Sequence, residues 1–371
     1  MIFSIALLVG SLFYALFLYK VATYWSAGKK APLRPQVNEL PFFSVIIPAR
    51  NEVTTIQACL SAVLTQSYPR ERVEIIVVDD HSEDGTSVQV QAIADERIQF
   101  LQLSGEDHGK KAAITKAIGL AKGDILVFTD ADCIAGPDWL NQISQLILAG
   151  NNMILAPVQL SARSNLLEAF QGLDVCGTLL LTGAAVQAGS PILANGANLA
   201  ISRSLFIELD GFIGNTHRAS GDDIFLLQKA VKSPQVKIAF AFDKKASVQT
   251  PPAIRWSEFF WQRLRWAGKT SGYTDKYLIL FQAAVYILNL GLLLGIPLLF
   301  TASYYVSILV GAYLIKAFSE YYYLRFASQE LGNPKWINWF IPALGLHMLY
   351  VVLVGSLALL PISSRWKGRK V

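Results

Sequence analysis

Residues that could do chemistry follow three short apolar runs in the first third of the chain. They are Pro48-Ala49-Arg50-Asn51-Glu52 after residues 43–47, Asp79-Asp80-His81-Ser82 after residues 74–78, and Thr129-Asp130-Ala131-Asp132 after residues 125–128. Several carboxylates gathered in one cleft repel one another unless a cation lies among them. Mg²⁺ and Mn²⁺ prefer carboxylate and phosphate oxygens. The pattern therefore predicts a metal site at Asp130 and Asp132, with an exposed loop carrying incidental acids as the alternative.

The apolar runs alternate with segments of helical periodicity, and this alternation predicts the elements that position those acids. The expected strands cover residues 43–47, 74–78, 98–103 and 125–128, and the expected helices lie near 56–64, 87–95, 110–121 and 138–149. Strands and helices in alternation form crossover units in a mainly parallel sheet. Ligands of such sheets bind beyond the carboxyl ends of the strands. We therefore expect an α/β fold with its chemistry at one edge of the sheet.

Two familiar phosphate-binding patterns fail on spacing. No Gly-x-Gly-x-x-Gly follows the first expected strand, so a dinucleotide fold would lack its phosphate turn. Residues 105–111 resemble a phosphate loop but are one residue short, and Lys111 stands where Ser or Thr should bind magnesium. Lys110 and Lys111 lie near the start of an expected helix, where they could still face a diphosphate. The four histidines, His81, His108, His217 and His347, show no zinc spacing.

Two later clusters complete the candidate residues. Asp222 and Asp223 precede an apolar run and would open a helix, where acids also suit the helix dipole without any catalytic role. Residues 256–266 are aromatic and basic, and they end ten residues before a long uncharged stretch. An amphipathic helix at a membrane surface explains that composition equally well, with tryptophans at the headgroups and arginines on phosphates.

Charge is absent from three long stretches, residues 1–19, 277–315 and 336–364. The chain has 371 residues, 32 basic and 27 acidic, and its mean hydropathy of +0.39 is high for a soluble protein. Residues 20–276 carry 25 basic and 25 acidic side chains, so the net charge of +5 lies after residue 315. A neutral foldable region excludes a basic nucleic-acid domain. Three cysteines in a chain of this length fit a reducing compartment.

An apolar run of about 18 residues can cross a bilayer. We expect a retained anchor at Ile2–Tyr19, two spans near 277–298 and 301–318, and a further span at 337–361 with Trp336 and Trp339 as interfacial anchors. The expected domains are an anchor at 1–20, a linker at 21–41, a catalytic domain at 42–276 with an interfacial helix near 255–270, membrane helices at 277–362 and a basic tail at 363–371.

Positive residues near the expected spans predict the orientation in the membrane. Lys20, Lys29, Lys30 and Arg34 follow the first span, which places the N-terminus outside and residues 20–276 in the cytoplasm. Three further spans would put the tail outside, yet Arg365, Lys367, Arg369 and Lys370 favour the inside. One apolar segment therefore lies in the interface or re-enters the membrane, and the sequence leaves open which one.

Taken together, these residues resemble the family 2 glycosyltransferases with a GT-A fold. Residues 43–85 look like the nucleotide-binding start of that family, and residues 109–133 resemble the stretch that ends in its Asp-x-Asp motif. Asp222-Asp223 stands where the family has a Glu-Asp pair, and residues 262–266 match its Gln-x-x-Arg-Trp motif. The resemblance covers about residues 42–270. Asp222 replaces the more usual Glu, and the membrane part looks small beside that of the cellulose and hyaluronan synthases.

The resemblance implies a role for each matching residue. Pro48, Ala49, Glu52 and Asp80 would hold the base and ribose of a nucleotide sugar, linked to UDP as in the family. Lys111, at the start of its expected helix, would face the diphosphate. Asp130 would touch the ribose or sugar, and Asp132, with Asp130, would bind Mg²⁺ or Mn²⁺. Asp223, beside Asp222, would deprotonate the acceptor. Arg265 would stabilise the leaving nucleotide, and Gln262 and Trp266 would contact the acceptor or sugar. Residues 196–198 match a family segment near the acceptor.

The preferred function is an inverting, metal-dependent glycosyltransferase in the bacterial inner membrane that glycosylates a lipid or lipid-linked acceptor at the cytoplasmic face. The Gln-x-x-Arg-Trp motif lies close to the expected membrane, so an amphiphilic acceptor could reach it. A processive polysaccharide synthase is the first alternative, since that motif is typical of such enzymes. A non-catalytic membrane scaffold is the second, although intact Asp130, Asp132, Asp223 and Arg265 weigh against it.

Overall fold

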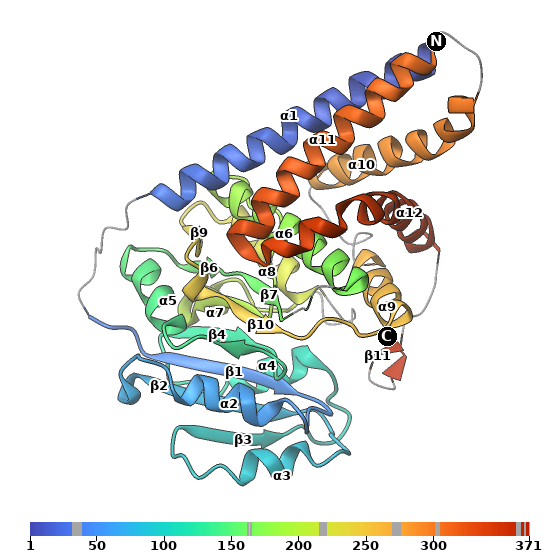
Figure 1. The fold of residues 1–371 in the computed structure, drawn as a ribbon. Coiled ribbons are helices and arrows are strands. Elements are labelled where there is room, and N and C mark those ends of the chain that lie inside the picture. Colours follow the sequence, from blue (N-terminus) through green and yellow to red (C-terminus); the bar gives the residue numbers. More distant parts are fainter. Residues whose placement is uncertain are drawn as a thin grey trace.

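A seven-stranded sheet forms the centre of the protein, and a bundle of long helices covers one end of it (Figure 1). The computed structural model describes residues 1–31, 39–161, 163, 165–214, 221–268, 276–300, 305–360, 365–366 and 369–370, the last four by their backbone. Arg34, His217 and Lys367, which the sequence analysis names, lie outside the described residues. The structure therefore does not describe Arg34, one of the four positive residues that predict the orientation in the membrane.

The sheet has the order β3-β2-β1-β4-β8-β6-β9. Its strands are β1 (Phe43–Ala49), β2 (Val73–Asp79), β3 (Ile98–Gln102), β4 (Ile125–Thr129), β6 (Met153–Leu155), β8 (Asn198–Ser202) and β9 (Ile238–Phe240). The four predicted strands are confirmed and pair in parallel. β8 was not predicted, and it runs antiparallel to both β4 and β6. The sheet is therefore mixed but mostly parallel.

Helices cover both faces of the sheet. They are α2 (Ile56–Leu64), α3 (Thr86–Gln91), α4 (Lys110–Ile118), α5 (Trp139–Leu148), α6 (Leu166–Gln187), α7 (Arg203–Glu208), α8 (Asp222–Lys232) and α9 (Trp256–Ala267). β1 is an apolar run because it is covered on both sides: Ile46 joins the core under α4 and α6, while Val45 and Ile47 join the core under α2 and α5. The predicted helices are confirmed, with α3 and α4 ending a few residues earlier.

Short elements complete the domain. A second sheet contains β5 (Ile134–Ala135), β10 (Val248–Thr250) and β7 (Val158–Leu160), and β11 (Arg365–Trp366) pairs with β12 (Arg369–Lys370). Single 3₁₀ turns cover η1 (Arg70–Arg72), η2 (Lys244–Ala246), η4 (Ile296–Phe300) and η5 (Pro334–Trp339). The second sheet matters for the site because β5 begins just after Asp132 and β10 contains Thr250.

Three long helices run beside one another above the domain: α1 (Ile2–Lys30), α10 (Lys276–Gly295) and α11 (Val306–Leu331) (Figure 1). The Tyr14 hydroxyl donates to Glu320 at 2.9 Å, and Trp25 Nε1 donates to Glu330 at 3.3 Å, so α1 and α11 point the same way. α10 points the opposite way. The expected linker begins later than predicted, because residues 21–30 continue α1 and Trp25 is fully buried.

α11 is longer than the expected span at 301–318 and continues to Leu331. It passes through two charged residues because they neutralise each other: Lys316 Nζ lies 2.7 and 2.8 Å from the two carboxylate oxygens of Glu320, and both side chains are buried. An unpaired charge is costly in apolar surroundings, whereas a paired one is tolerated. The length of the uncharged stretch therefore underestimates the length of this helix.

The last long helix, α12 (Phe340–Ala358), contacts α11 near its start and α10 near its end. At its start, the Phe340 ring is 5.3 Å from that of Tyr321, next to the residue that meets Tyr14 of α1. Near its end, Ser356 Oγ is 2.8 Å from the Tyr286 hydroxyl in the middle of α10. Both ends of α12 thus meet the bundle at about half its height, so α12 does not run along it.

Four helices are long and apolar enough to cross a membrane: Ile2–Lys30, Leu166–Gln187, Leu278–Phe300 and Pro334–Ala358. The second of these, α6, was not singled out in the sequence. It packs against α1 and α11 on one side and β9 on the other, and 61% of its apolar window is buried in the protein. We therefore assign α6 to the interior of the protein, between the sheet and the bundle.

Trp336 is not the interfacial anchor that the sequence suggests. Its side chain is 1% exposed and lies against Gly172 of α6 and Gly332, and its Nε1 donates to the Arg163 carbonyl oxygen at 2.8 Å. The two glycines leave room for the indole ring. Trp336 is therefore a core residue that joins η5 to α6.

Replacing Trp336 by Ala is accordingly expected to lower the free energy of unfolding by about 3–5 kcal/mol, because it removes a buried indole and leaves a cavity. Thermal unfolding of the purified chain in detergent would measure this. The matched control is Trp261→Ala, whose side chain is 47% exposed on α9. Equal unfolding temperatures for the two variants would contradict a core role for Trp336.

Candidate active site

One cavity of about 1270 Å³ lies between the carboxyl ends of the strands and the helical bundle. All twelve residues that the sequence analysis proposed for the site line it: Pro48, Ala49, Glu52, Asp80, Lys111, Asp130, Asp132, Asp222, Asp223, Gln262, Arg265 and Trp266. They come from strand ends and from the first turns of α4 and α8, together with α9. The parallel strands place their ends together, as expected for ligand binding in an α/β sheet.

Asp130 and Asp132 follow β4 directly and face this cavity. Asp132 Oδ2 accepts a hydrogen bond from Thr250 Oγ1 at 3.2 Å, and Asp130 Oδ1 lies 2.5 Å from Lys110 Nζ. The Asp130 side chain is 39% exposed. Two carboxylates on one turn that line the cavity fit a hard divalent metal ion, which would share Asp130 with Lys110. The sequence did not predict that Lys110 would neutralise Asp130.

The two lysines at the start of α4 contact carboxylates. Burial would lower the pKa of Lys110, but the neighbouring carboxylates, above all that of Asp130, raise it well above its usual value. Lys111 Nζ lies 3.3 Å from Asp222. Burial raises the pKa of the Asp222 carboxyl, and Lys111 opposes that rise. At this end of the cavity each of the two lysines therefore forms an ion pair with an aspartate.

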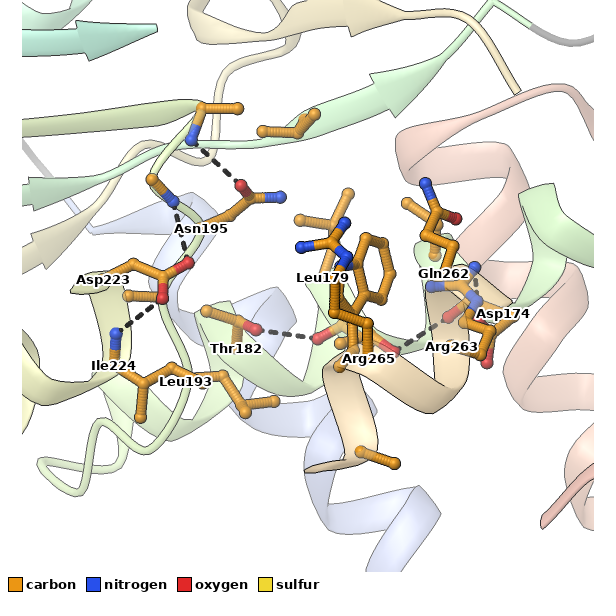
Figure 2. Close-up of a pocket in the computed structure, with 18 of the residues that line it drawn as sticks. Asp174, Leu179, Thr182, Leu193, Asn195, Asp223, Ile224, Gln262, Arg263 and Arg265 are labelled. Atoms are coloured by element: carbon orange, nitrogen blue, oxygen red, sulfur yellow. Dashed lines mark hydrogen bonds and ion pairs between the residues drawn. The ribbon is translucent and has the colours of Figure 1, made fainter. Parts of the chain in front are cut away.

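Asp223 is held by backbone amides at the start of α8 (Figure 2). Its Oδ2 accepts from the Gly196 amide at 3.0 Å and its Oδ1 from the Ile224 amide at 2.8 Å. Burial lowers the pKa of Arg265, whereas Asp130 and Asp223 raise it, so this guanidinium lies within electrostatic reach of both acids. Gly196 belongs to the segment that the sequence placed near an acceptor.

α9 contributes a stacked arginine that the sequence analysis did not use. Arg263 pairs with Asp174 of α6 at 2.8 Å, and its side chain is 5% exposed (Figure 2). Its guanidinium lies 4.9 Å from the centre of the Phe259 ring and 4.3 Å from that of Trp266. The resemblance suggests that Trp266 stacks on acceptor or sugar, but here Arg263 stacks on the indole. The sequence could have indicated this stacking, because Arg263 stands between Phe259 and Trp266 on one helix.

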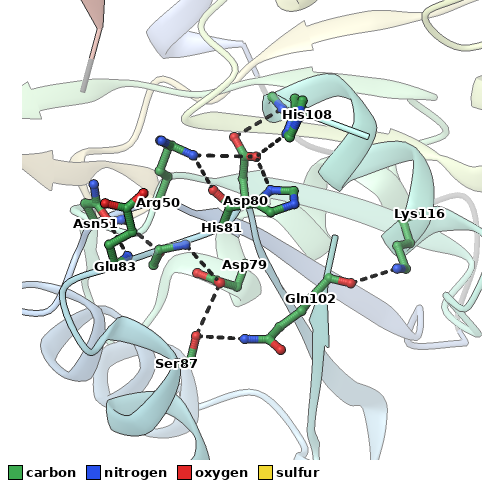
Figure 3. Close-up of polar contacts among 12 residues, drawn as sticks. Arg50, Asn51, Asp79, Asp80, His81, Glu83, Ser87, Gln102, His108 and Lys116 are labelled. Carbon is green, nitrogen blue, oxygen red and sulfur yellow. Dashed lines mark hydrogen bonds and ion pairs between the residues drawn. The ribbon is translucent and has the colours of Figure 1, made fainter. Parts of the chain in front are cut away.

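A second polar cluster surrounds Asp80 at the end of β2 (Figure 3). Asp80 is 3% exposed; its Oδ2 accepts from the Gly109 amide at 3.1 Å, and Arg50 Nη1 donates to its carbonyl oxygen at 2.7 Å. The rings of His81 and His108 are 4.6 Å apart. Ligand atoms of Asp80, His81 and His108 lie within 4.8 Å of one another, so this group could also hold a metal. Linear spacing missed it because the two histidines come from different loops.

Comparison with known proteins gives the class of this domain. The family model "Glycosyl transferase family 2" matches residues 44–181. Glycosyltransferase AglE of Haloferax volcanii is 41% identical over 105 residues, 28% of this chain and 34% of that protein. Probable glycosyltransferase YdaM of Bacillus subtilis is 27% identical over 260 residues, 67% and 60% of the two chains. The chain thus spans less than two thirds of the length of these relatives.

A solved structure shows the same fold. It is the mannosyltransferase PcManGT from Pyrobaculum calidifontis in complex with GDP-Man and Mn²⁺, with a TM-score of 0.58, 19% sequence identity, and coverage of 96% of this chain and 98% of that one. At this identity the likeness concerns the fold. Together the comparisons show that residues 44–181 match the model of the family 2 glycosyltransferases, and that the chain has a GT-A-like fold.

Proposed function

We propose that the protein is an inverting, metal-dependent glycosyltransferase that moves a sugar from a nucleotide sugar to a lipid or lipid-linked acceptor at the cytoplasmic face of a bacterial inner membrane. One observation carries this proposal. The cavity that holds Asp130, Asp132 and Asp223 is also lined by α10, α11 and α12. An acceptor embedded in a membrane could therefore reach the acids without leaving the lipid.

The donor would bind at the ends of β1, β2 and β4. Pro48, Ala49, Glu52 and Asp80 would hold the nucleoside, with Asp80 fixed by the Gly109 amide. Asp130 and Asp132 would hold Mg²⁺ or Mn²⁺, which supplies positive charge to the donor diphosphate when bound. Lys111 Nζ lies 3.3 Å from Asp222 and would pair with that carboxylate or with the donor diphosphate. The GDP-Man and Mn²⁺ of PcManGT support a nucleotide sugar and a divalent ion. The nucleotide of the donor would be UDP or GDP.

Transfer would need a base for the acceptor and a positive group for the leaving nucleotide. Asp223 would take the proton from the acceptor hydroxyl, and the Gly196 and Ile224 amides fix the direction of its carboxylate. Arg265 would stabilise the negative charge that grows on the leaving diphosphate. Asp222, Gln262 and Trp266 would position these groups. Attack from the side opposite the leaving group inverts the configuration at the anomeric carbon.

The geometry of the long helices supports a specific membrane arrangement. In our proposal α1, α10 and α11 cross the membrane, α12 lies along its cytoplasmic interface, and α6 stays within the protein. Three crossings from an outside N-terminus bring the tail back to the cytoplasm, where Arg365 and Lys370 satisfy the positive-inside rule. This removes the conflict in the sequence-based count of spans.

An epitope tag fused after Val371 is therefore expected to be protected from protease in right-side-out vesicles and cleaved after lysis. A tag before Met1 should show the opposite pattern, since α1 and α11 point the same way. Immunoblotting of the two fusions checks this. Cleavage of the C-terminal tag in intact vesicles would contradict an interfacial α12.

The function itself is tested by supplying membranes that contain the protein with a panel of nucleotide sugars. We expect one donor to yield a single-sugar product in the organic extract, identified by mass spectrometry. The Gln262-x-x-Arg265-Trp266 motif on the cavity wall favours a processive synthase as the second candidate, and a long polymer would establish it. No turnover of any donor would favour a non-catalytic scaffold.

A further inference from the structure

We propose, building on the proposed function, that the acceptor is an uncharged lipid alcohol whose chain enters the cavity between α10 and α12. Its free hydroxyl would reach Asp223, and its apolar chain would remain among the long helices. Lipid phosphates would be poor acceptors. Three features of the cavity lead to this acceptor class: its opening, its charge and the group at its inner end.

We infer that the cavity opens where α10 and α12 meet, because Leu359 at the end of α12 is 84% exposed and still forms part of the wall. The side chains with which the two helices line the cavity are mostly apolar. Tyr286 and Ser356 join the two helices by a 2.8 Å hydrogen bond, and Tyr286 also lies against Gly355. Because these helices belong to the apolar part of the protein, the opening suits a hydrocarbon chain.

Between this opening and Asp223 the wall carries paired charge. Asp174 and Arg263 form a 2.8 Å ion pair, and Arg263 is flanked by the Phe259 and Trp266 rings. Tyr350 of α12 packs against Phe259 at 5.7 Å. The positive charge of Arg263 is already balanced by Asp174. A hydroxyl can hydrogen-bond here, whereas an anionic headgroup would compete with Asp174.

The charge of the whole wall also disfavours an anion. Among the described residues that line the cavity, Glu320 is neutralised by Lys316, and the other seven acidic residues still outnumber the five Lys or Arg. A divalent metal and the donor diphosphate would roughly cancel each other. A lipid phosphate would therefore add negative charge to a wall that already has an excess of it, and repulsion of this kind is strong away from bulk water.

Asp223, at the inner end of the cavity, favours a hydroxyl over a phosphate as the acceptor group because it can act as a base. An alcohol oxygen must lose a proton during transfer, so a carboxylate base beside it lowers the barrier. A phosphate oxygen is already ionised near neutral pH and needs no base. The two amide hydrogen bonds to Asp223 place such a base at the cavity wall. The O–H bond breaks toward Asp223 as the bond from that oxygen to the anomeric carbon forms and the nucleotide leaves.

The acceptor class is tested with the purified full-length chain in mixed micelles, with Mn²⁺ and whichever nucleotide sugar the donor panel identifies. The acceptors are dioleoylglycerol and a polyprenyl monophosphate at equal mole fraction. We expect at least a tenfold higher yield of extractable product from dioleoylglycerol. Preferred transfer to the phosphate would overturn the inference while leaving the proposed glycosyltransferase function intact, because donor turnover would still be seen.

A binding experiment tests the same inference without any transfer. Diazirine analogues of dioleoylglycerol and of the polyprenyl phosphate are photolysed with the protein, and labelled peptides are mapped. We expect the diacylglycerol probe to label α10 and α12, and Ala358→Trp at the opening to reduce labelling at least fivefold. Leu349→Trp is the matched control, since Leu349 is exposed on α12 but does not line the cavity. Equal labelling of the two variants, or preferential labelling by the phosphate probe, would overturn the proposal.

Discussion

Replacing Asp223 by Asn is expected to lower the turnover number by about 10²–10⁴-fold, the usual contribution of a general base. The nucleotide-sugar affinity should change little, because the donor groups come from β1, β2 and β4 rather than from α8. Asn keeps the shape of Asp and can still accept one of the two amide hydrogen bonds that fix Asp223. Steady-state kinetics and donor binding by calorimetry measure the two quantities separately.

The control for this variant is Asp210→Asn. Asp210 is exposed and has a φ of 53°, a left-handed conformation that Asn adopts readily. Its turnover should equal that of the unchanged protein. An Asp223→Asn enzyme with normal turnover would remove the base from our mechanism, and one that loses donor affinity instead would assign Asp223 to donor binding.

Asp132→Ala is expected to lower activity by about 10²–10³-fold, since metal stabilisation of a developing charge is worth several kcal/mol. In the unchanged protein, chelation should abolish donor turnover and added Mn²⁺ should restore it. The variant should respond to neither treatment. Manganese titrations monitored by donor turnover would record both effects, together with the metal affinity.

The matched control is Asp107→Ala, an exposed acid in the loop before α4 that does not line the cavity. It should keep full activity and the same metal response. If Asp132→Ala retains metal-dependent turnover, the ion binds elsewhere. The Asp80, His81 and His108 group is then the next place to test, because its ligand atoms already lie within 4.8 Å of one another.

The sequence predicted the first half of the fold because buried parallel strands appear as continuous apolar runs between helical patterns. β1, β2 and β4 follow that rule, whereas the edge strand β3 is only partly buried and mixes apolar with polar residues. β8 was not predicted, although Asn198–Ser202 is also a short segment with apolar residues in the middle. Its position between β4 and β6 is set by long-range antiparallel pairing, and nothing in the local pattern specifies that partner.

The site was predictable to the extent that it depends on strand ends. The acids after β2 and β4 come together because parallel strands end at one edge, and Asp223 joins them from the start of α8. The pairs Lys110–Asp130 and Asp174–Arg263 were not predicted, since each joins residues of different elements. Trp336 was misplaced for a similar reason: its surroundings depend on Gly172, far away in the sequence.

Hydropathy predicted the long apolar helices but not their directions. An uncharged stretch long enough to cross a bilayer produces both α10, which runs along the bundle, and α12, which runs across it. The difference comes from contacts such as that of Phe340 with Tyr321. Conversely, α11 carries Lys316 and Glu320 within its length and is still a long helix of the bundle, because the two side chains neutralise each other.

The burial of Trp25 makes the apolar helix α1 part of the core of the sheet domain. This side chain, near the end of α1, is fully buried against Gly183 of α6 and the Phe240 and Phe242 rings. The partners of Trp25 lie some 160 or more residues further along the chain. The core of the domain is thus complete only when α1 packs against it. A version trimmed to begin at residue 42 would lack one wall of its core, so water-soluble fragments should be poor starting points for biochemistry.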